Sequence, residues 1–184
     1  MDFFKRHHHI LATTIFVLSI VVAHIFSTDG YDWTQNTISE LGAQGYRRKL
    51  ILQVGFLAFG ITLTLGILIN GLSWRATPIL IYGLCVALTG VFCTKPFIEI
   101  ASYSGAESTI HSALAQVAGF AFSMGILTQL FFTPETNLKW IHLAFFVLVI
   151  GLSATFGLLD HSQGIVQRLL YAASFVWLIG YYKP

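Results

Sequence analysis

The segment from Leu50 to Ser73, LILQVGFLAFGITLTLGILINGLS, runs for 24 residues without a charged side chain. A bilayer core is about 30 Å thick, and a helix of about 20 apolar residues crosses it. This segment is therefore long and apolar enough to cross a membrane as a helix. Five more apolar runs flank it, and the full set is Ile10–Phe26, Leu50–Ser73, Pro78–Thr94, Thr109–Phe132, Trp140–Leu159 and Val166–Tyr182.

The composition of the whole chain agrees with a membrane protein. Of its 184 residues, 55% are hydrophobic and 10% are charged, whereas a soluble domain has about 25% charged residues. The net charge is +2 and the ten Lys and Arg lie at the ends of the apolar runs, which excludes a nucleic-acid-binding protein with a basic stripe. Six crossings leave short connections, so we expect one domain over residues 1–184.

The runs predict helices rather than strands. Backbone groups in lipid must be hydrogen-bonded within a helix or a closed barrel, and barrel strands alternate in polarity over about ten residues. None of the six runs alternates. We therefore expect an all-α, polytopic bundle of six transmembrane helices.

An even number of crossings puts both termini on one face, here called the near face, and the opposite face is the far face. Each face carries five of the ten basic residues, so the positive-inside rule does not decide the orientation. The first helix often decides it, and the loop after that helix, Ser27–Tyr46, lacks Lys and Arg until its end. We expect a protein of the cell (inner) membrane with both termini in the cytoplasm.

Ionisable residues concentrate on the far face. Arg168 lies in the first turn of the last apolar run, where an unpaired charge is costly, so we expect a carboxylate partner and favour Glu40. His24, His111 and His161 belong to the same face. So do six of the eight acids, namely Asp29, Asp32, Glu40, Glu99, Glu107 and Asp160. The sequence thus predicts a far-face ligand site formed by Glu40, Glu107, His111, Asp160 and Arg168.

Two of these acids also have a purely structural interpretation. Thr37-x-x-Glu40 and Ser104-x-x-Glu107 match the capping box, in which the Glu side chain bonds to the amide that starts a helix. Glu107 and His111 share one helical face, because they are four residues apart. The first loop is about twenty residues long, and we expect it to fold over the far end as a lid, with a helical turn that begins at Thr37.

The histidine triplet and the cysteines also have structural interpretations. His7–His9 follows Lys5 and Arg6, so we expect it on the surface that flanks the first helix. Cys85 and Cys93 are eight residues apart, which is about 12 Å along a helix. That separation exceeds the span of a disulfide, and we expect two small buried side chains.

Four strings along the chain resemble a known family. They are Asn36–Gly42, Gly90–Phe92, His111–Ala113 with the following Ala115–Phe120, and Gly164–Arg168. The chain resembles a bacterial and archaeal family of six-helix membrane proteins, domain of unknown function 998. The resemblance implies the six-helix fold, singles out Glu40, His111 and Arg168, and implies no reaction. Where the family tends to carry Pro-x-Asp after Gly-x-Phe, this chain has Glu99.

Three classes of function fit these residues, and whether the chain is an enzyme stays open. We favour binding of an amphiphile or lipid headgroup at the far face, with Arg168 as the anion anchor and no cofactor. The second class is a metal-dependent intramembrane hydrolase with His24, His111 and His161 as Zn²⁺ ligands. The third is a b-type haem protein that uses His24 and His111. The oligomeric state is not predicted.

The orientation can be measured with a reporter enzyme that is active only outside the cytoplasm. Fused after Lys183 it should be inactive, whereas fused within the far-face loop at Gln35 it should be active. The reverse pattern would place the termini outside the cytoplasm.

Overall fold

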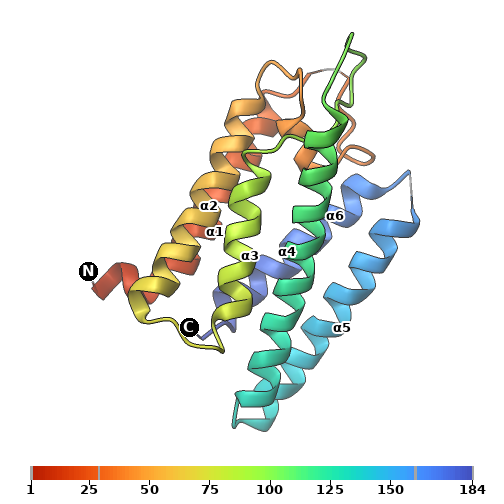
Figure 1. Cartoon of the computed structure of the whole chain (residues 1–184). Coiled ribbons are helices and arrows are strands. Elements are labelled where there is room, and N and C mark those ends of the chain that lie inside the picture. Colours follow the sequence, from red (N-terminus) through yellow and green to blue (C-terminus); the bar gives the residue numbers. More distant parts are fainter. Residues whose placement is uncertain (1, 29, 160, 184) are drawn as a thin grey trace.

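The computed structural model describes residues 2–28, 30–159 and 161–183, so Asp29 and Asp160 lie outside the described residues. The described residues form six α-helices and one 3-10 helix, and they contain no strand (Figure 1). The elements are α1 (Asp2–Ile25), η1 (Ile38–Gly42), α2 (Lys49–Asn70), α3 (Thr77–Thr89), α4 (Gly105–Phe132), α5 (Thr136–Leu158) and α6 (Gln163–Gly180). The all-α fold expected from the sequence is confirmed.

The helices form a membrane bundle in which they follow one another around a ring in chain order. Each helix contacts the next one, and α1 also contacts α6. Of the described helices, α1, α2, α4 and α5 are long and apolar enough to cross a membrane. The two chain ends lie at the same end of the bundle (Figure 1), as an even number of passes requires. We keep the names near end and far end for the ends that hold the two faces.

Helix α3 is shorter than its apolar run. The expected helix Pro78–Thr94 ends instead at Thr89, and the chain continues toward the far end without regular structure. At Gly90 a Cβ atom would lie 2.8 Å from the carbonyl oxygen of Gln53 on α2. The backbones of α2 and of the α3 end therefore pack directly on each other, as small residues allow in membrane bundles.

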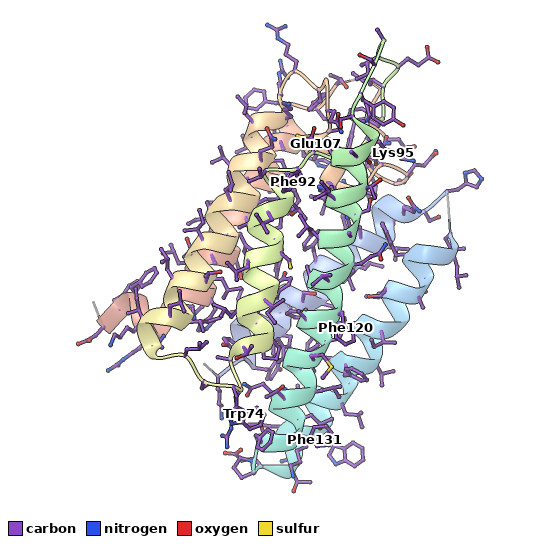
Figure 2. The ribbon with its side chains drawn as sticks, viewed as in Figure 1. Trp74, Phe92, Lys95, Glu107, Phe120 and Phe131 are labelled. Carbon is purple, nitrogen blue, oxygen red and sulfur yellow. The ribbon has the colours of Figure 1, made fainter. Side chains whose placement is uncertain are left out.

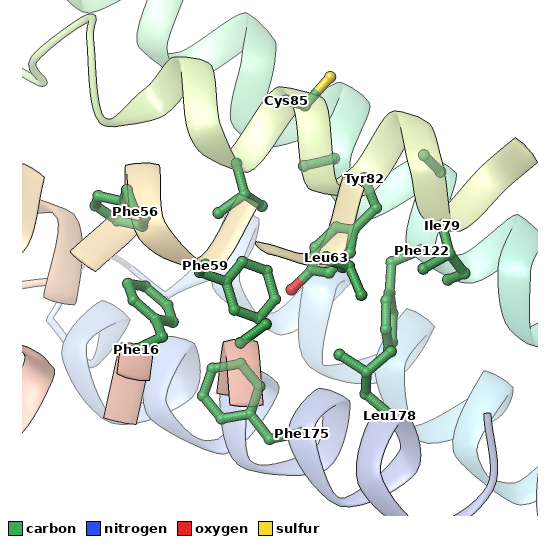
Figure 3. Packing of buried hydrophobic residues seen from close by; sticks show 14 of the residues in the cluster. Phe16, Phe56, Phe59, Leu63, Ile79, Tyr82, Cys85, Phe122, Phe175 and Leu178 are labelled. Carbon is green, nitrogen blue, oxygen red and sulfur yellow. The ribbon is translucent and has the colours of Figure 1, made fainter. Parts of the chain in front are cut away.

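Aromatic side chains fill the centre of the bundle (Figure 3). Phe16 of α1 is fully buried, and its ring centroid lies 4.9 Å from that of Phe56 and 5.3 Å from that of Phe59, both on α2. Phe175 of α6 completes this group at 5.8 Å from Phe16. The packed rings hold α1, α2 and α6 together.

Two histidines of the triplet, His8 and His9, lie inside the bundle, which corrects the expectation of a flanking surface for these two; His7 is half-exposed. Helix α1 begins at Asp2, so the triplet is helical, and His8 and His9 are 0% and 7% exposed. A Cβ atom on Gly66 of α2 would lie 2.0 Å from the His8 ring. The absence of a side chain at Gly66 therefore makes the space that His8 occupies.

Replacing Gly60 tests the close packing of α2 on α3. A Cβ atom there would lie 2.3 Å from the carbonyl oxygen of Gly83 and 2.5 Å from the amide nitrogen of Ala87. Gly60→Ala should therefore lower stability by about 1–3 kcal/mol, a loss of several degrees in Tm measured in detergent. Gly119→Ala on α4 is the matched control, because its Cβ would meet nothing within 4 Å. Equal Tm values for both variants would contradict this packing.

Candidate functional site at the far end

The first loop folds over the far end, as the sequence predicts. Its 3-10 helix η1 contacts α1, α2 and α6. Ile38 and Leu41 of η1 are 2% and 0% exposed, so they anchor the loop in the apolar interior. We call the segment from Tyr31 to Gly42 the lid.

The carboxylate of Glu40 serves the lid itself. It accepts hydrogen bonds from the Thr37 backbone N–H at 2.6 Å and from the Thr37 hydroxyl at 3.1 Å. A Glu that bonds back to the residue before the helix is the Glu half of a capping box. The structural interpretation of Glu40 is confirmed.

Arg168 binds the lid through oxygen atoms that carry no formal charge. Its guanidinium donates to the carbonyl oxygens of Asn36 at 3.0 Å and Gly164 at 2.8 Å, and to the hydroxyl of Tyr31 at 2.7 Å. The expected ion pair with Glu40 is therefore wrong: these three oxygens take its place, while the Glu40 carboxylate caps η1. Three acceptors around one fork-shaped cation explain the use of Arg at this position.

Tyr31 connects Arg168 to the start of η1. Its hydroxyl donates to the carbonyl oxygen of Thr37 at 2.8 Å while it accepts from Arg168. Burial of the ring raises the pKa of Tyr31 to about 12. The phenol therefore keeps its proton at neutral pH, and that proton is needed for the bond to Thr37.

The lid also covers the start of α6. The backbone N–H groups of Gly164 and Ile165 donate to the carbonyl oxygens of Gln35 at 3.0 Å and Thr34 at 3.1 Å. The first N–H groups of a helix have no partner within it, and lid carbonyls supply that partner here. A Cβ on Gly164 would lie 2.5 Å from the carbonyl oxygens of Trp33 and Asn36, so only Gly permits this approach.

A second polar cluster, at the α3 end, contains Glu107 and His111. Figure 2 shows Glu107 close to the Phe92–Lys95 segment at the far end. The Glu107 carboxylate accepts from the Cys93 N–H at 2.6 Å, and His111 Nδ1 bonds to the Phe92 carbonyl oxygen at 2.7 Å. Both side chains thus satisfy backbone groups of the irregular segment that follows α3, as buried backbone requires.

Two glutamines in this region were not singled out from the sequence. The Gln44 amide donates to the carbonyl oxygens of Cys93 at 3.2 Å and Ser104 at 2.9 Å, and its oxygen accepts from the Ser104 N–H at 2.7 Å. The Gln167 oxygen accepts from the Ile38 N–H at 2.5 Å. A polar amide inside an otherwise apolar run was the available signal at Gln167, whereas Gln44 lies in a loop where glutamine is common.

Cys93 is a buried structural thiol. It is 3% exposed, and its sulfur lies 2.9 Å from the Gln53 amide nitrogen. Burial raises the pKa of Cys93 above its usual value, so the thiol stays protonated and is a poor nucleophile. Cys85 is buried as well, and both cysteines are free, as expected.

The structure separates the remaining predicted site residues. His24 packs edge-on against Tyr31 with 5.4 Å between ring centroids, His111 lies in the cluster at the α3 end, and His161 is exposed. The described residues contain no group of three or more His, Cys, Asp or Glu side chains that is arranged to hold a metal ion. The proposed haem ligands His24 and His111 come from α1 and α4, which are not neighbours in the ring. Asp160 lies outside the described residues, and Glu99 is exposed.

An apolar groove of about 550 Å³ lies on the outer surface between α1 and α2. Its walls are Ile15, Leu18, Ser19 and Val22 of α1 and Leu50, Ile51 and Val54 of α2. Just beyond its far end, Arg48 donates to the Phe26 carbonyl oxygen at 2.6 Å, and its guanidinium carbon lies 5.4 Å from the centre of the Phe26 ring. Arg48 thus lies two residues before Leu50, at the far-end side of a shallow apolar groove.

Replacing Arg168 tests the attachment of the lid. Arg168→Lys removes the fork that reaches three oxygens, so we expect a lower Tm and faster proteolysis between Tyr31 and Thr37 in intact membranes. Arg47→Lys is the control, because Arg47 is exposed. Wild-type proteolysis and Tm in Arg168→Lys would show that Arg168 only extends toward headgroup water.

Sequence comparison identifies the family. No curated protein and no solved structure matches the chain. The family model described as "Protein of unknown function (DUF998)" matches residues 10–182. That match covers nearly the whole chain, from within α1 to beyond the end of α6, so this protein belongs to the family of integral membrane proteins known as domain of unknown function 998.

Proposed function

We propose that this protein binds an anionic amphiphile at the far end of the bundle, in the leaflet that we expect to be non-cytoplasmic. The alkyl chain lies in the groove between α1 and α2, and the headgroup contacts Arg48 and its neighbour Arg47. The observation that carries the proposal is the exposed Arg48 two residues before Leu50, which lines the apolar groove.

The dimensions of the groove suit an alkyl chain. Ile15 and Val22 are seven residues apart, which is about 10 Å along α1. A Cβ on Gly55 would lie 2.5 Å from the Ser19 Cβ atom, so α1 and α2 meet at the floor of the groove and leave larger apolar side chains on its rim. The Ser19 hydroxyl is occupied by its bond to the Ile15 carbonyl oxygen at 2.9 Å, which makes the surface effectively apolar.

Arg48 has the donors that an anionic headgroup needs. Its contact with Phe26 uses one N–H and the face of the guanidinium, and an Arg side chain has five N–H donors in total. Arg48 is exposed, so its other donors are accessible to the phosphate oxygens of lipids at the membrane boundary. Arg47 is exposed beside it and adds a second positive charge.

The residues first expected to hold the ligand support this site indirectly. Arg168 and Glu40 fix the lid, and Glu107 and His111 fix the segment after α3. In this proposal they are positioning residues, and Arg48 replaces Arg168 as the anion anchor. No specific contact favours the hydrolase or the haem alternative.

Binding of short-chain lipids to the detergent-solubilised protein tests the proposal. Dioctanoyl phosphatidylglycerol should bind more tightly than dioctanoyl phosphatidylcholine, measured by native mass spectrometry. Loss of charge-assisted hydrogen bonds in Arg47→Ala/Arg48→Ala should weaken phosphatidylglycerol binding about tenfold. Lys95→Ala removes an exposed far-face cation outside the groove and should leave binding unchanged.

A second variant tests the groove itself. Val54→Trp should fill the groove and weaken binding of both lipids, because Val54 lines it. Val147→Trp is the control, since Val147 is 62% exposed on α5. Equal binding of the two lipids, or unchanged binding in Val54→Trp, would refute a specific site and leave only ordinary contact with bulk lipid.

A further inference from the structure

A second cavity, of about 560 Å³, opens at the near end of the bundle. It lies between the α2–α3 connection, the end of α4, the α4–α5 connection and Lys183. The proposed function uses none of these residues. Figure 2 shows Trp74 and Phe131 at this end, opposite Glu107.

Arg75 stands at the cavity wall against aromatic faces. Its guanidinium carbon is 4.6 Å from the centre of the Phe132 ring and 5.7 Å from that of Trp74. The two rings contact each other edge-to-face at 4.7 Å. Contact through ring faces orients a guanidinium without using its in-plane N–H groups, so those donors stay available to an anion in the cavity.

A second cation lines the same cavity. The Gln129 amide donates to the backbone carbonyl oxygen of Lys183 at 3.0 Å and fixes the end of the described chain against α4. The lining also contains one acid, Glu135. Among the described residues the two cations and one carboxylate give the lining a formal charge of +1.

The buried wall of the cavity supplies a directed hydroxyl. Thr133 is 6% exposed, and its hydroxyl oxygen lies 3.3 Å from His142 Nε2. Trp177 Nε1 donates to His142 Nδ1 at 3.1 Å. Because an indole nitrogen only donates, Nδ1 carries no proton, and the proton of the neutral imidazole is on Nε2.

The direction of these two hydrogen bonds determines whether the Thr133 hydroxyl can donate to a ligand. His142 Nε2–H donates to the Thr133 oxygen, so the hydroxyl hydrogen of Thr133 is free to donate to another acceptor. Thr133 lines the cavity. Two buried side chains thus leave the hydroxyl hydrogen of Thr133 available as a donor at a cavity that Arg75 and Lys183 also line.

We propose that this cavity binds the phosphate group of an anionic lipid in the near leaflet, with Thr133, Arg75 and Lys183 as its donors. A lipid phosphate is negatively charged at neutral pH and its oxygens are strong hydrogen-bond acceptors, which matches three donors of which two are cationic. Trp74 and Phe132 are 63% and 45% exposed beside them. Aromatic side chains of this kind lie at the level of lipid headgroups, which favours a lipid over a free phosphate ion.

Isothermal titration of the detergent-solubilised protein with dioctanoyl phosphatidic acid tests this site. Thr133→Val keeps the shape of the side chain, removes the donor and should weaken binding about tenfold, as should Arg75→Gln. Thr128→Val is the matched control: Thr128 also lines the cavity, but its hydroxyl already donates to the Met124 carbonyl oxygen at 2.8 Å. Thr133→Ser, which restores the hydroxyl, should restore binding.

Two further arms separate this site from other sources of binding. The Arg47→Ala/Arg48→Ala protein lacks the anion anchor beside the far groove. Binding of phosphatidic acid that persists in this protein and is lost with Thr133→Val belongs to the near cavity, so the two proposals can fail independently. Inorganic phosphate should bind at least tenfold more weakly than the lipid, and equal affinity would overturn the lipid assignment. Unchanged lipid binding in Thr133→Val, with an unchanged Tm, would overturn the site itself.

Discussion

Backbone N–H and C=O groups away from water must find hydrogen-bond partners, and the far end of this bundle is built around that requirement. Six helices satisfy their own interiors, but the lid, the start of α6 and the segment after α3 are irregular or terminal. Arg168 and Gln167 supply partners for the lid, and Glu107 and His111 supply them for the segment after α3. Polar side chains at the edge of an apolar bundle are therefore explained first by the backbone that they bind.

The strings by which the chain resembles its family meet in space as two pairs. Residues of Asn36–Gly42 bond to residues of Gly164–Arg168 over a separation of more than 120 positions, and Phe92 of Gly90–Phe92 bonds to His111. Each pair joins an irregular segment to the first turns of a helix. The strings thus meet at two joints of the far end, and their two charged residues, Glu40 and Arg168, both hold the lid.

The two ends of the bundle use polar groups differently. At the far end, Arg168 and Glu107 are used in internal bonds, whereas Arg47, Arg48 and Lys95 are exposed, and Arg48 lies beside an apolar groove. At the near end the buried groups are neutral histidine, tryptophan and threonine, and their bonds run in one direction toward a cavity. Internal satisfaction favours stability, whereas a donor without an internal acceptor favours a ligand.

The sequence by itself determined the all-α class and the order of the helices. The reason is that the bilayer alone sets the length of an apolar run and requires its backbone to be bonded within a helix, whatever the rest of the fold. It also determined the lid and the Glu40 cap, since both follow from local spacing. The tertiary structure alone decided the partner of Arg168, because carbonyl oxygens carry no sequence signal and the choice between them and Glu40 depends on where the lid lies. For the same reason only the structure showed that α3 ends early, that His8 is buried beside Gly66 and that Arg48 lies near the groove. Each of these features depends on how closely two distant backbone segments approach.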